Sequence, residues 1–153
     1  MQRRPTYETE GDRQRELEVA EVLARKGGMK PIKLKEFSNV DFALMKGDAV
    51  WGVIEVKVRN KLYPQMMLSL HKVQSLRDYA ALGLEARVVY ATPEGIYVKK
   101  VGPERIDGWI GFGGRTDRGD EADQELMVFF GGREEQEPIK RVAASRPEWF
   151  HSK

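Results

Sequence analysis

Val50–Arg59, which reads VWGVIEVKVR, is the stretch that decides the fold. It is rich in β-branched residues, and successive side chains of a strand point to opposite faces of a sheet. The face formed by the even-numbered residues is apolar and indicates a core face: Val50, Gly52, Ile54, Val56 and Val58. The other face carries Glu55 and Lys57 in the middle of the strand. An acid and an ammonium group at mid-strand require an explanation.

A second strand pattern precedes this stretch. Asn39–Met45 alternates apolar and polar residues, and Asp41 lies on the face opposite its apolar side chains. The intervening Lys46–Ala49 (KGDA) is typical of a turn, so the two strands are expected to form an antiparallel hairpin.

The register of this hairpin can be argued from the pattern. A two-residue loop at Gly47–Asp48 would oppose Asp41 to Ile54 and so place an acid against a core position. We therefore expect a three-residue loop, Gly47–Ala49, which opposes Asp41 to Glu55. Because like charges repel across a strand pair, a cation is expected between the two carboxylates.

Two helices flank the hairpin in the sequence. The pattern predicts one helix over Asp12–Lys26, with Glu16 near the centre of its apolar side, where an unpaired acid is costly. A second helix is expected from a cap at Ser69 to Leu82, with Lys72 at the border of its buried side.

The remaining patterns complete an α/β protein with a mixed central β-sheet flanked by helices. Three further core strands are expected: Lys30–Phe37, Ala86–Ala91 and Ile96–Val101. The glycine-rich stretch 108–120 is expected to be a loop, followed by a strand at Leu126–Phe130 with Ile139–Ala143 as its candidate partner. We accordingly expect a flexible arm (1–11), a core (12–101) and a β-rich C-terminal extension packed on the same domain (102–153).

Composition excludes several classes of site. A chain of 153 residues with 41% hydrophobic residues fits one domain with a real core. It has no cysteine and only two histidines, so a metal site would use carboxylates, which favour magnesium, manganese or calcium. The net charge of +2 does not by itself indicate nucleic acid, and the lysines and arginines gathered at 30–35 and 57–61 are equally typical of a solvated face.

No apolar run approaches the roughly eighteen residues of a membrane span, and the N-terminal segment lacks the apolar core of a signal peptide. We therefore expect an intracellular, cytoplasmic protein without membrane association.

Together, the acids predict a hard oxygen site. Asp41, Glu55 and Lys57 share a face, and Glu16 can approach from the first helix. Such a site suits Mg²⁺, which keeps several waters and takes further ligands from a phosphate. The metal would polarise a phosphodiester and lower the pKa of a water molecule, and the lysine would orient the nucleophile or neutralise developing charge.

At this point the residues resemble a known family. Asp41, followed fourteen residues later by Glu55-Val56-Lys57 and preceded by a glutamate on a helix, resembles the PD-(D/E)xK nuclease superfamily with its restriction-endonuclease-like αβββαβ core. The resemblance implies that Asp41 and Glu55 bind metal, that Val56 offers its backbone carbonyl, and that Lys57 assists the nucleophile. Asn39-Val40 stands where the family has its proline.

The two predicted helices resemble those of particular members of this superfamily. The first is similar to the opening helix of archaeal Holliday-junction resolvases, which implies that Glu16, or else Glu18, contributes to the metal site. The second is similar to the helix on which many relatives carry a lysine or glutamine that supports the active site. That role would fall on Lys72, with Gln74 as the alternative.

The expected function is a metal-dependent DNA endonuclease that uses Mg²⁺, with Mn²⁺ as a substitute, and works as a homodimer. It would be Holliday-junction-resolvase-like or otherwise structure-specific, and phage- or plasmid-encoded. One alternative is a non-catalytic nucleic-acid-binding or accessory protein on a nuclease scaffold, acting through its basic residues or through 102–153. Another is that Glu55 and Lys57 form a solvated pair on a one-sided sheet.

Overall fold

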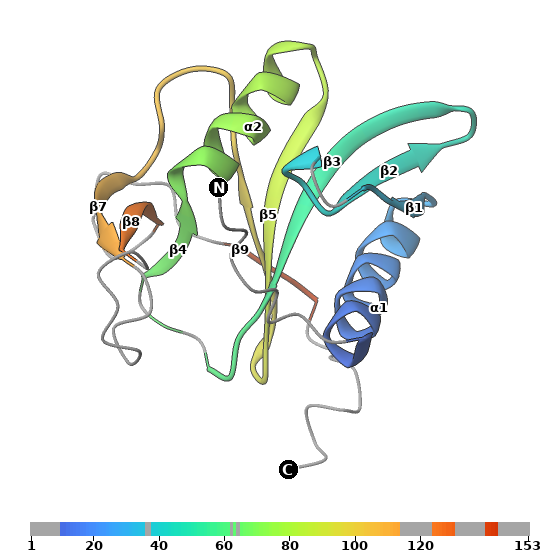
Figure 1. Ribbon diagram of the computed structural model, residues 1–153. Coiled ribbons are helices and arrows are strands. Elements are labelled where there is room, and N and C mark those ends of the chain that lie inside the picture. Colours follow the sequence, from blue (N-terminus) through green and yellow to red (C-terminus); the bar gives the residue numbers. More distant parts are fainter. Residues whose placement is uncertain are drawn as a thin grey trace.

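The computed structural model describes residues 10–35, 38–61, 63, 65–113, 124–130 and 140–143 (Figure 1). In this part of the chain the elements, in order, are α1 (Glu10–Lys26), β1 (Lys30–Lys33), β2 (Phe42–Lys46), β3 (Ala49–Val58), β4 (Met66–Ser69), α2 (Leu70–Ala81), β5 (Glu85–Thr92), β6 (Gly95–Lys100), β7 (Trp109–Gly113), β8 (Glu125–Phe130) and β9 (Lys140–Ala143). Neither described helix is long and apolar enough to cross a membrane.

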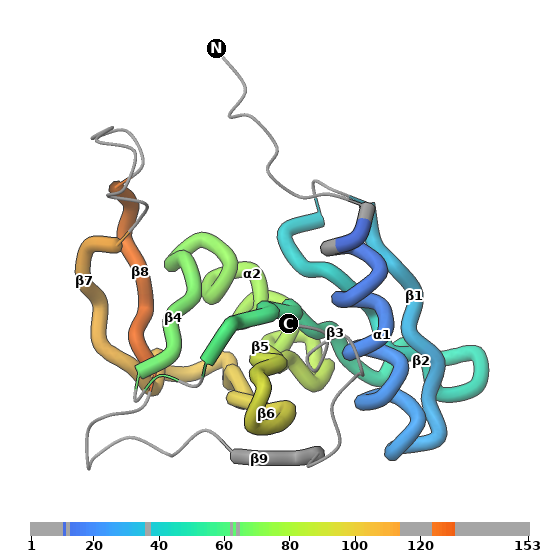
Figure 2. The backbone as a smooth tube through the Cα atoms, turned by 90° about the horizontal axis from the view of Figure 1, so that it is seen from below, coloured from blue at the N-terminus to red at the C-terminus, as the bar shows by residue number. Residues whose placement is uncertain are grey.

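The main sheet is mixed, as the sequence predicts. Its six strands have the order β1-β2-β3-β5-β6-β9, and only β3 and β5 pair in parallel. A parallel pair needs a crossover connection, which here contains β4 and α2. Helix α1 covers one face of the sheet and α2 covers the other (Figures 1 and 2).

Strand β3 therefore contributes to a hydrophobic core on each face. Ile54 and Val56 pack with α1, whereas Val53 packs with α2. The α1 core also contains Val19, Ala20, Leu23 and Ala24, and the α2 core contains Val73, Leu76, Val88 and Tyr90. Glu55 lies on the α2 side and is 1% exposed. The interpretation of a one-sided sheet with a solvated acid is thus wrong.

A second, three-stranded sheet lies on the side of α2 that faces away from α1 (Figures 1 and 2). Its order is β4-β8-β7, all antiparallel. A loop was expected over 108–120, and this prediction is wrong where β7 forms. The short strand β4 was not anticipated. The candidate partner of β8 is also wrong, since β9 pairs with β6 instead.

The glycines of β7 explain why it was mistaken for a loop. Trp109 stacks on Phe129 of β8, with ring centroids 4.3 Å apart. A Cβ atom at Gly111 would lie 3.1 Å from the Trp109 ring, and one at Gly113 would lie 2.5 Å from Met127. These glycines thus make room for large neighbours within a strand, and are not turn residues.

Both helices form where they were predicted, with small differences at their ends. Helix α1 begins at Glu10, slightly before the expected Asp12, and residues 1–9 of the expected arm lie outside the described residues. Ser69 is the N-cap of α2 as expected, but its side chain makes no capping hydrogen bond.

The β2–β3 hairpin corrects the expected loop. Lys46 pairs with Ala49, so the turn has two residues, Gly47 and Asp48, rather than the predicted three. Gly47 takes a positive φ of 62°, which glycine adopts without steric cost. The two-residue turn alone would have opposed Asp41 to a core residue.

A β-bulge restores the predicted register. Met45 pairs with Val50 but Leu44 pairs with Gly52, so Trp51 is the extra residue on β3. Beyond the bulge Phe42 pairs with Ile54, and the same register continued by one residue opposes Asp41 to Glu55. Val50, expected in the core, is exposed in the part of the hairpin that reaches beyond α1 (Figure 1).

Candidate active site

The candidate site lies where β2 separates from β3. The backbone N–H of Asp41 still donates to the carbonyl of Ile54, at 3.1 Å. One step further along β3, the N–H of Val56 donates to Oδ2 of the Asp41 side chain, at 2.8 Å. Asn39 turns the preceding chain with a positive φ of 61°, which asparagine tolerates better than most residues. The Asp41 carboxylate thus binds β3 where backbone pairing ends.

One carboxylate oxygen of Glu55 interacts with two lysine side chains. Lys72 of α2 donates a hydrogen bond to Oε1 of Glu55, and Lys57 Nζ lies 3.4 Å from the same atom. The other oxygen, Oε2, is buried and has no hydrogen-bond partner among the described residues. A buried polar atom without a partner is costly, so this oxygen is available to a ligand that would compensate it.

The electrostatics of the site reflect burial and like charge. Burial raises the pKa of Glu55, and the nearby Asp41 carboxylate raises it further, which outweighs the opposite effects of Lys57 and Lys72. Burial also lowers the pKa of Lys72, but Glu55, Asp41 and Glu16 together more than offset this, so its pKa is raised. Burial is thus the largest cause of the raised pKa of Glu55, with the neighbouring acid second.

Lys33 is a residue of the site that the sequence interpretation missed. Its Nζ lies 3.5 Å from Oδ1 of Asp41 and 4.9 Å from the centroid of the Phe42 ring. It reaches Asp41 because β1 pairs with β2 so that Lys33 opposes Phe42. In the sequence it was visible only as one of several clustered lysines, because nothing local predicts which strand β1 joins.

Glu16 belongs to the helix on the opposite face of the sheet, but its charge influences groups of the site. It is half-buried, and it favours the charged forms of both Lys72 and Arg59. Burial lowers the pKa of Arg59, with Tyr90, Tyr63 and Glu16 opposing that effect. Of the two glutamates considered on α1, Glu16 is the one with this electrostatic connection.

On α2, the structure brings Lys72 to Glu55 and leaves Gln74 elsewhere. Gln74 is exposed, and its side-chain oxygen accepts a hydrogen bond from Arg77. Lys72 is therefore the residue of this helix that can support the site directly.

The donor set fits a divalent cation that prefers oxygen. Asp41 and Glu55 supply carboxylates, and the Oε2 atom of Glu55 is buried without a hydrogen-bond partner among the described residues. The described residues contain no group of three histidine, aspartate or glutamate side chains close enough to hold a metal. A cation such as Mg²⁺ typically uses one or two carboxylates plus water and phosphate oxygens, so two acids suffice.

Comparisons with known proteins give a family match and a fold match. A family model described as "Phage putative PDDEXK endonuclease" matches residues 2–136. The fold is similar to that of Hjc from Archaeoglobus fulgidus, a Holliday junction resolvase from an archaeal hyperthermophile, with a TM-score of 0.51 and 23% identity over 78% of this chain and 83% of that chain. No curated protein matches the sequence. The structural similarity establishes the restriction-endonuclease-like fold.

Proposed function

The chain belongs to the family of phage PDDEXK endonucleases, and we propose that it is a magnesium-dependent, structure-specific DNA endonuclease. Membership in this family makes it a DNA-hydrolysing nuclease. The metal ion, the DNA structure that it cuts, its oligomeric state and the roles of individual residues are the proposed parts.

The observation that carries the proposal is the pair of acids at the end of β2–β3 pairing. Asp41 is held by the backbone of Val56, and Glu55 is buried with one oxygen unpartnered. Burial of two neighbouring carboxylates is unfavourable unless positive charge reaches them. A divalent cation supplies that charge at the oxygens that the lysines leave open.

In this proposal Asp41 and Glu55 hold the metal, with the Val56 carbonyl as a further ligand. Glu16, expected from the resemblance to be a ligand, forms no three-acid group with them among the described residues and acts on the site through its charge. When bound, Mg²⁺, or Mn²⁺ in its place, polarises the phosphoryl oxygens and lowers the pKa of a coordinated water. The protein's own contribution is to hold the acids in fixed positions. Asp41 cannot rotate freely because Val56 N–H binds one oxygen and Lys33 lies near the other.

The two lysines that contact Glu55, Lys57 and Lys72, have different roles in this proposal. Lys57 is 26% exposed and lies near Glu55, so it can orient the attacking water and neutralise charge that develops on the phosphate. Lys72 donates a hydrogen bond to Glu55, which favours the ionised carboxylate and orients it. Water then attacks phosphorus and gives up a proton to solvent, the bond to the leaving oxygen breaks, and that oxygen takes a proton from solvent.

Support for branched substrates comes from the fold similarity to a Holliday junction resolvase, which is an argument by analogy. We expect a homodimer, because each chain has one pair of acids and paired cuts on two strands need two centres. A phage enzyme of this kind would meet its DNA in the cytoplasm of the infected cell.

A cleavage assay tests the proposal. Four-way junctions, nicked duplex, single strands and intact duplex are incubated with protein in Mg²⁺, in Mn²⁺ and in EDTA. We expect metal-dependent cleavage that Lys57→Ala slows by about 100-fold or more, the usual effect of removing a group that stabilises transition-state charge. Lys46→Ala is the matched control, because Lys46 is an exposed lysine at the tip of the same hairpin.

The outcomes separate the alternatives. Absence of cleavage on every substrate, together with DNA binding that depends on salt but not on metal, would support a non-catalytic nucleic-acid-binding protein instead. Mg²⁺ should also raise the thermal unfolding temperature of the wild type and not of Glu55→Gln, since a ligand stabilises the state that binds it. Light scattering on the same samples measures the oligomeric state.

A further inference from the structure

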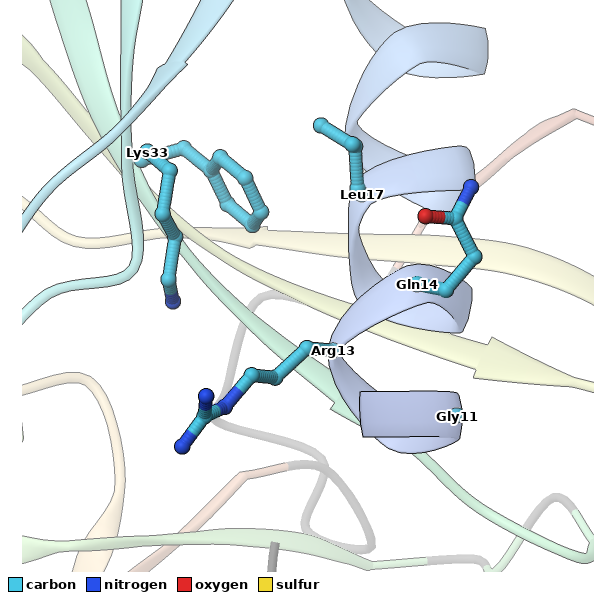
Figure 3. Close-up of a pocket in the computed structure, with 6 residues that line it drawn as sticks. Gly11, Arg13, Gln14, Leu17 and Lys33 are labelled. Carbon is cyan, nitrogen blue, oxygen red and sulfur yellow. The ribbon is translucent and has the colours of Figure 1, made fainter. Parts of the chain in front are cut away.

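A cavity of about 510 Å³ lies on the α1 side of the main sheet, and one of its lining residues, Lys33, contacts Asp41 (Figure 3). It is formed between the first turns of α1 and the strands β1 and β2. Its lining residues are Gly11, Arg13, Gln14, Leu17, Lys33 and Phe42. The proposed metal ligands are not among them, so the cavity is a neighbouring site and not the catalytic centre itself.

Lys33 connects the cavity to the catalytic centre. The side chain lines the cavity, and its Nζ lies 3.5 Å from Oδ1 of Asp41. The Phe42 ring lies beneath the same ammonium group at 4.9 Å, a cation–π distance that helps to hold it there. A ligand in the cavity would therefore contact Lys33, which in turn contacts Asp41, a proposed metal ligand.

The charge of the cavity is positive on one side. Figure 3 shows the Arg13 guanidinium and the Lys33 ammonium reaching toward the same side of the space from the helix and from the strand. Guanidinium and ammonium groups both bind phosphate oxygens well. Leu17 adds an apolar wall, and Gln14 adds an amide that can donate and accept hydrogen bonds.

This combination fits a nucleotide. A phosphate would meet Arg13 and Lys33, and a base would lie against Leu17 with Gln14 able to reach its edge. The volume falls within the range of roughly 300–1,000 Å³ that is usual for sites of small organic ligands. A base inside a regular duplex is stacked and paired, so only an unstacked nucleotide can enter a pocket.

We propose that this cavity binds one unstacked nucleotide adjacent to the scissile phosphate. The preferred substrate class is then DNA with a nucleotide outside the duplex stack, as at a gap, a flap or a branch point. The inference rests on the proposed endonuclease function, and it places the recognition of DNA structure in α1 and β1.

Binding without metal tests the inference independently of cleavage. The probe is a duplex with a one-nucleotide gap opposite a 2-aminopurine, whose fluorescence is quenched by stacking, and the protein is the full chain in EDTA. We expect tighter binding to this probe than to the intact duplex, together with a rise in 2-aminopurine fluorescence. Competition with unlabelled gapped and intact duplex measures the preference.

Gln14→Trp fills the cavity from an exposed helix position. It should weaken binding of the gapped probe by about tenfold or more, the effect of losing one bound base, and abolish the fluorescence rise. The control is Glu21→Trp, which adds the same ring at an exposed position further along α1. Its loss of a negative charge favours DNA binding, so it cannot mimic the expected loss. Circular dichroism verifies that both variants fold.

A second pair of variants tests the phosphate contact. Arg13→Ala should weaken binding of the gapped probe and reduce the slope of log affinity against log salt by about one. Arg25→Ala removes the same charge at the other end of α1, away from the cavity, and should leave the preference for the gap unchanged.

Each outcome is decisive. Equal affinity for gapped and intact duplex in the wild type, or an unchanged gap preference in Gln14→Trp, overturns the inference even if cleavage occurs. Cavity-dependent binding without cleavage of any DNA in Mg²⁺ or Mn²⁺ overturns the endonuclease proposal and leaves the nucleotide site standing. Failure to bind any DNA overturns both.

Discussion

Glu55 is the residue on which the chemistry of the site depends. It is 1% exposed, next to another acid, and held by Lys72 and Lys57 through one oxygen only. A residue chosen for stability at this position would be apolar, because a buried ion pair rarely exceeds the stability of a well-packed hydrophobic replacement. Burial of Glu55 therefore lowers the free energy of unfolding by an amount that can be measured and that depends on pH.

The raised pKa of Glu55 predicts how stability changes with pH in the metal-free protein. The folded state binds this proton more tightly than the unfolded state, whose carboxyl has a pKa near the ordinary 4.5. The associated stability is thus fully present below that value and is lost as the pH rises through the raised pKa. Each unit of the increase is worth about 1.4 kcal/mol.

Glu55→Gln removes this titration and keeps an oxygen acceptor for Lys72. Urea unfolding in EDTA between pH 4 and pH 8 should therefore show the variant gaining stability relative to the wild type as the pH increases. All other groups titrate in both proteins, so the difference isolates Glu55. A difference that stays constant over this range would show that Glu55 has no raised pKa.

At the residue scale, site residues could be predicted from the sequence where a regular alternation of apolar and polar residues placed them on one face of a strand. Alternation in Asn39–Met45 and Val50–Arg59 predicted that Asp41, Glu55 and Lys57 would share a site. Lys72 could be selected only through the resemblance of its helix to that of known nucleases. Lys33 could not be found, because its contact depends on the pairing of β1 with β2.

At the scale of elements, the close approach of β3 and β5 sets a limit on side-chain size. Gly52 lies directly after the bulge and pairs with Glu85. A Cβ atom at this glycine would lie 2.6 Å from the carbonyl oxygen of Glu85 and 2.9 Å from its Cβ atom. Neither of these atoms can move away without a shift of the β5 backbone.

Gly52→Ala should therefore destabilise the protein by about 1–3 kcal/mol, the usual cost of overpacking. The measurement is the free energy of unfolding from urea denaturation. Gly102→Ala is the control, since a Cβ atom there meets nothing within 4 Å, and it should stay within about 0.5 kcal/mol of the wild type. Equal effects of the two substitutions would contradict the close contact between β3 and β5.

The boundaries of helices and strands could be predicted where the hydrophobic pattern was long. The prediction failed where one residue determined the pairing of two strands. The helices and the strands β3, β5, β6 and β8 follow from periodicity and from flanking glycines. The two-residue turn, the bulge at Trp51 and the short strand β4 do not, because each depends on a pairing partner elsewhere in the chain.

At the scale of the whole molecule, we propose that the described parts of the C-terminal extension, 102–113, 124–130 and 140–143, form one folding unit with the core; the rest of the expected extension lies outside the described residues. Strand β8 supplies Val128 and Phe130 to the same hydrophobic core as Val73 and Leu76 of α2. Because α2 also carries Lys72, the second sheet supports the position of a proposed catalytic residue. Strand β9 joins the main sheet beside β6.

Phe130→Ala should then cost about 3–5 kcal/mol, as expected for a buried aromatic residue in a shared core. Phe112→Ala is the matched control on the same small sheet, because Phe112 is 77% exposed, and it should change stability by less than about 0.5 kcal/mol. Thermal or urea unfolding should remain a single transition in the wild type. Two separate transitions would contradict a shared core.

The sequence predicted the α/β class and the main sheet because its strands carry strong period-two patterns. It could not predict a second sheet, since β4 and β7 are short and β7 contains glycines that normally mark loops. The position of that sheet depends on packing against α2, a contact between segments far apart in the chain.

Because of the bulge at Trp51, the face on which the β3 side chains lie depends on the total number of residues in the turn and the bulge. An insertion in one of them can therefore compensate for a deletion in the other. A two-residue turn plus one extra residue on β3 brings Ile54 opposite Phe42, and this register continued by one residue brings Glu55 opposite Asp41. Removing Trp51 alone should turn Glu55 toward α1 and abolish cleavage. Removing Trp51 and inserting one glycine after Gly47 exchanges the bulge for a longer turn and should restore both the facing acids and the activity. In natural relatives, a lengthened turn is accordingly expected together with loss of the bulge.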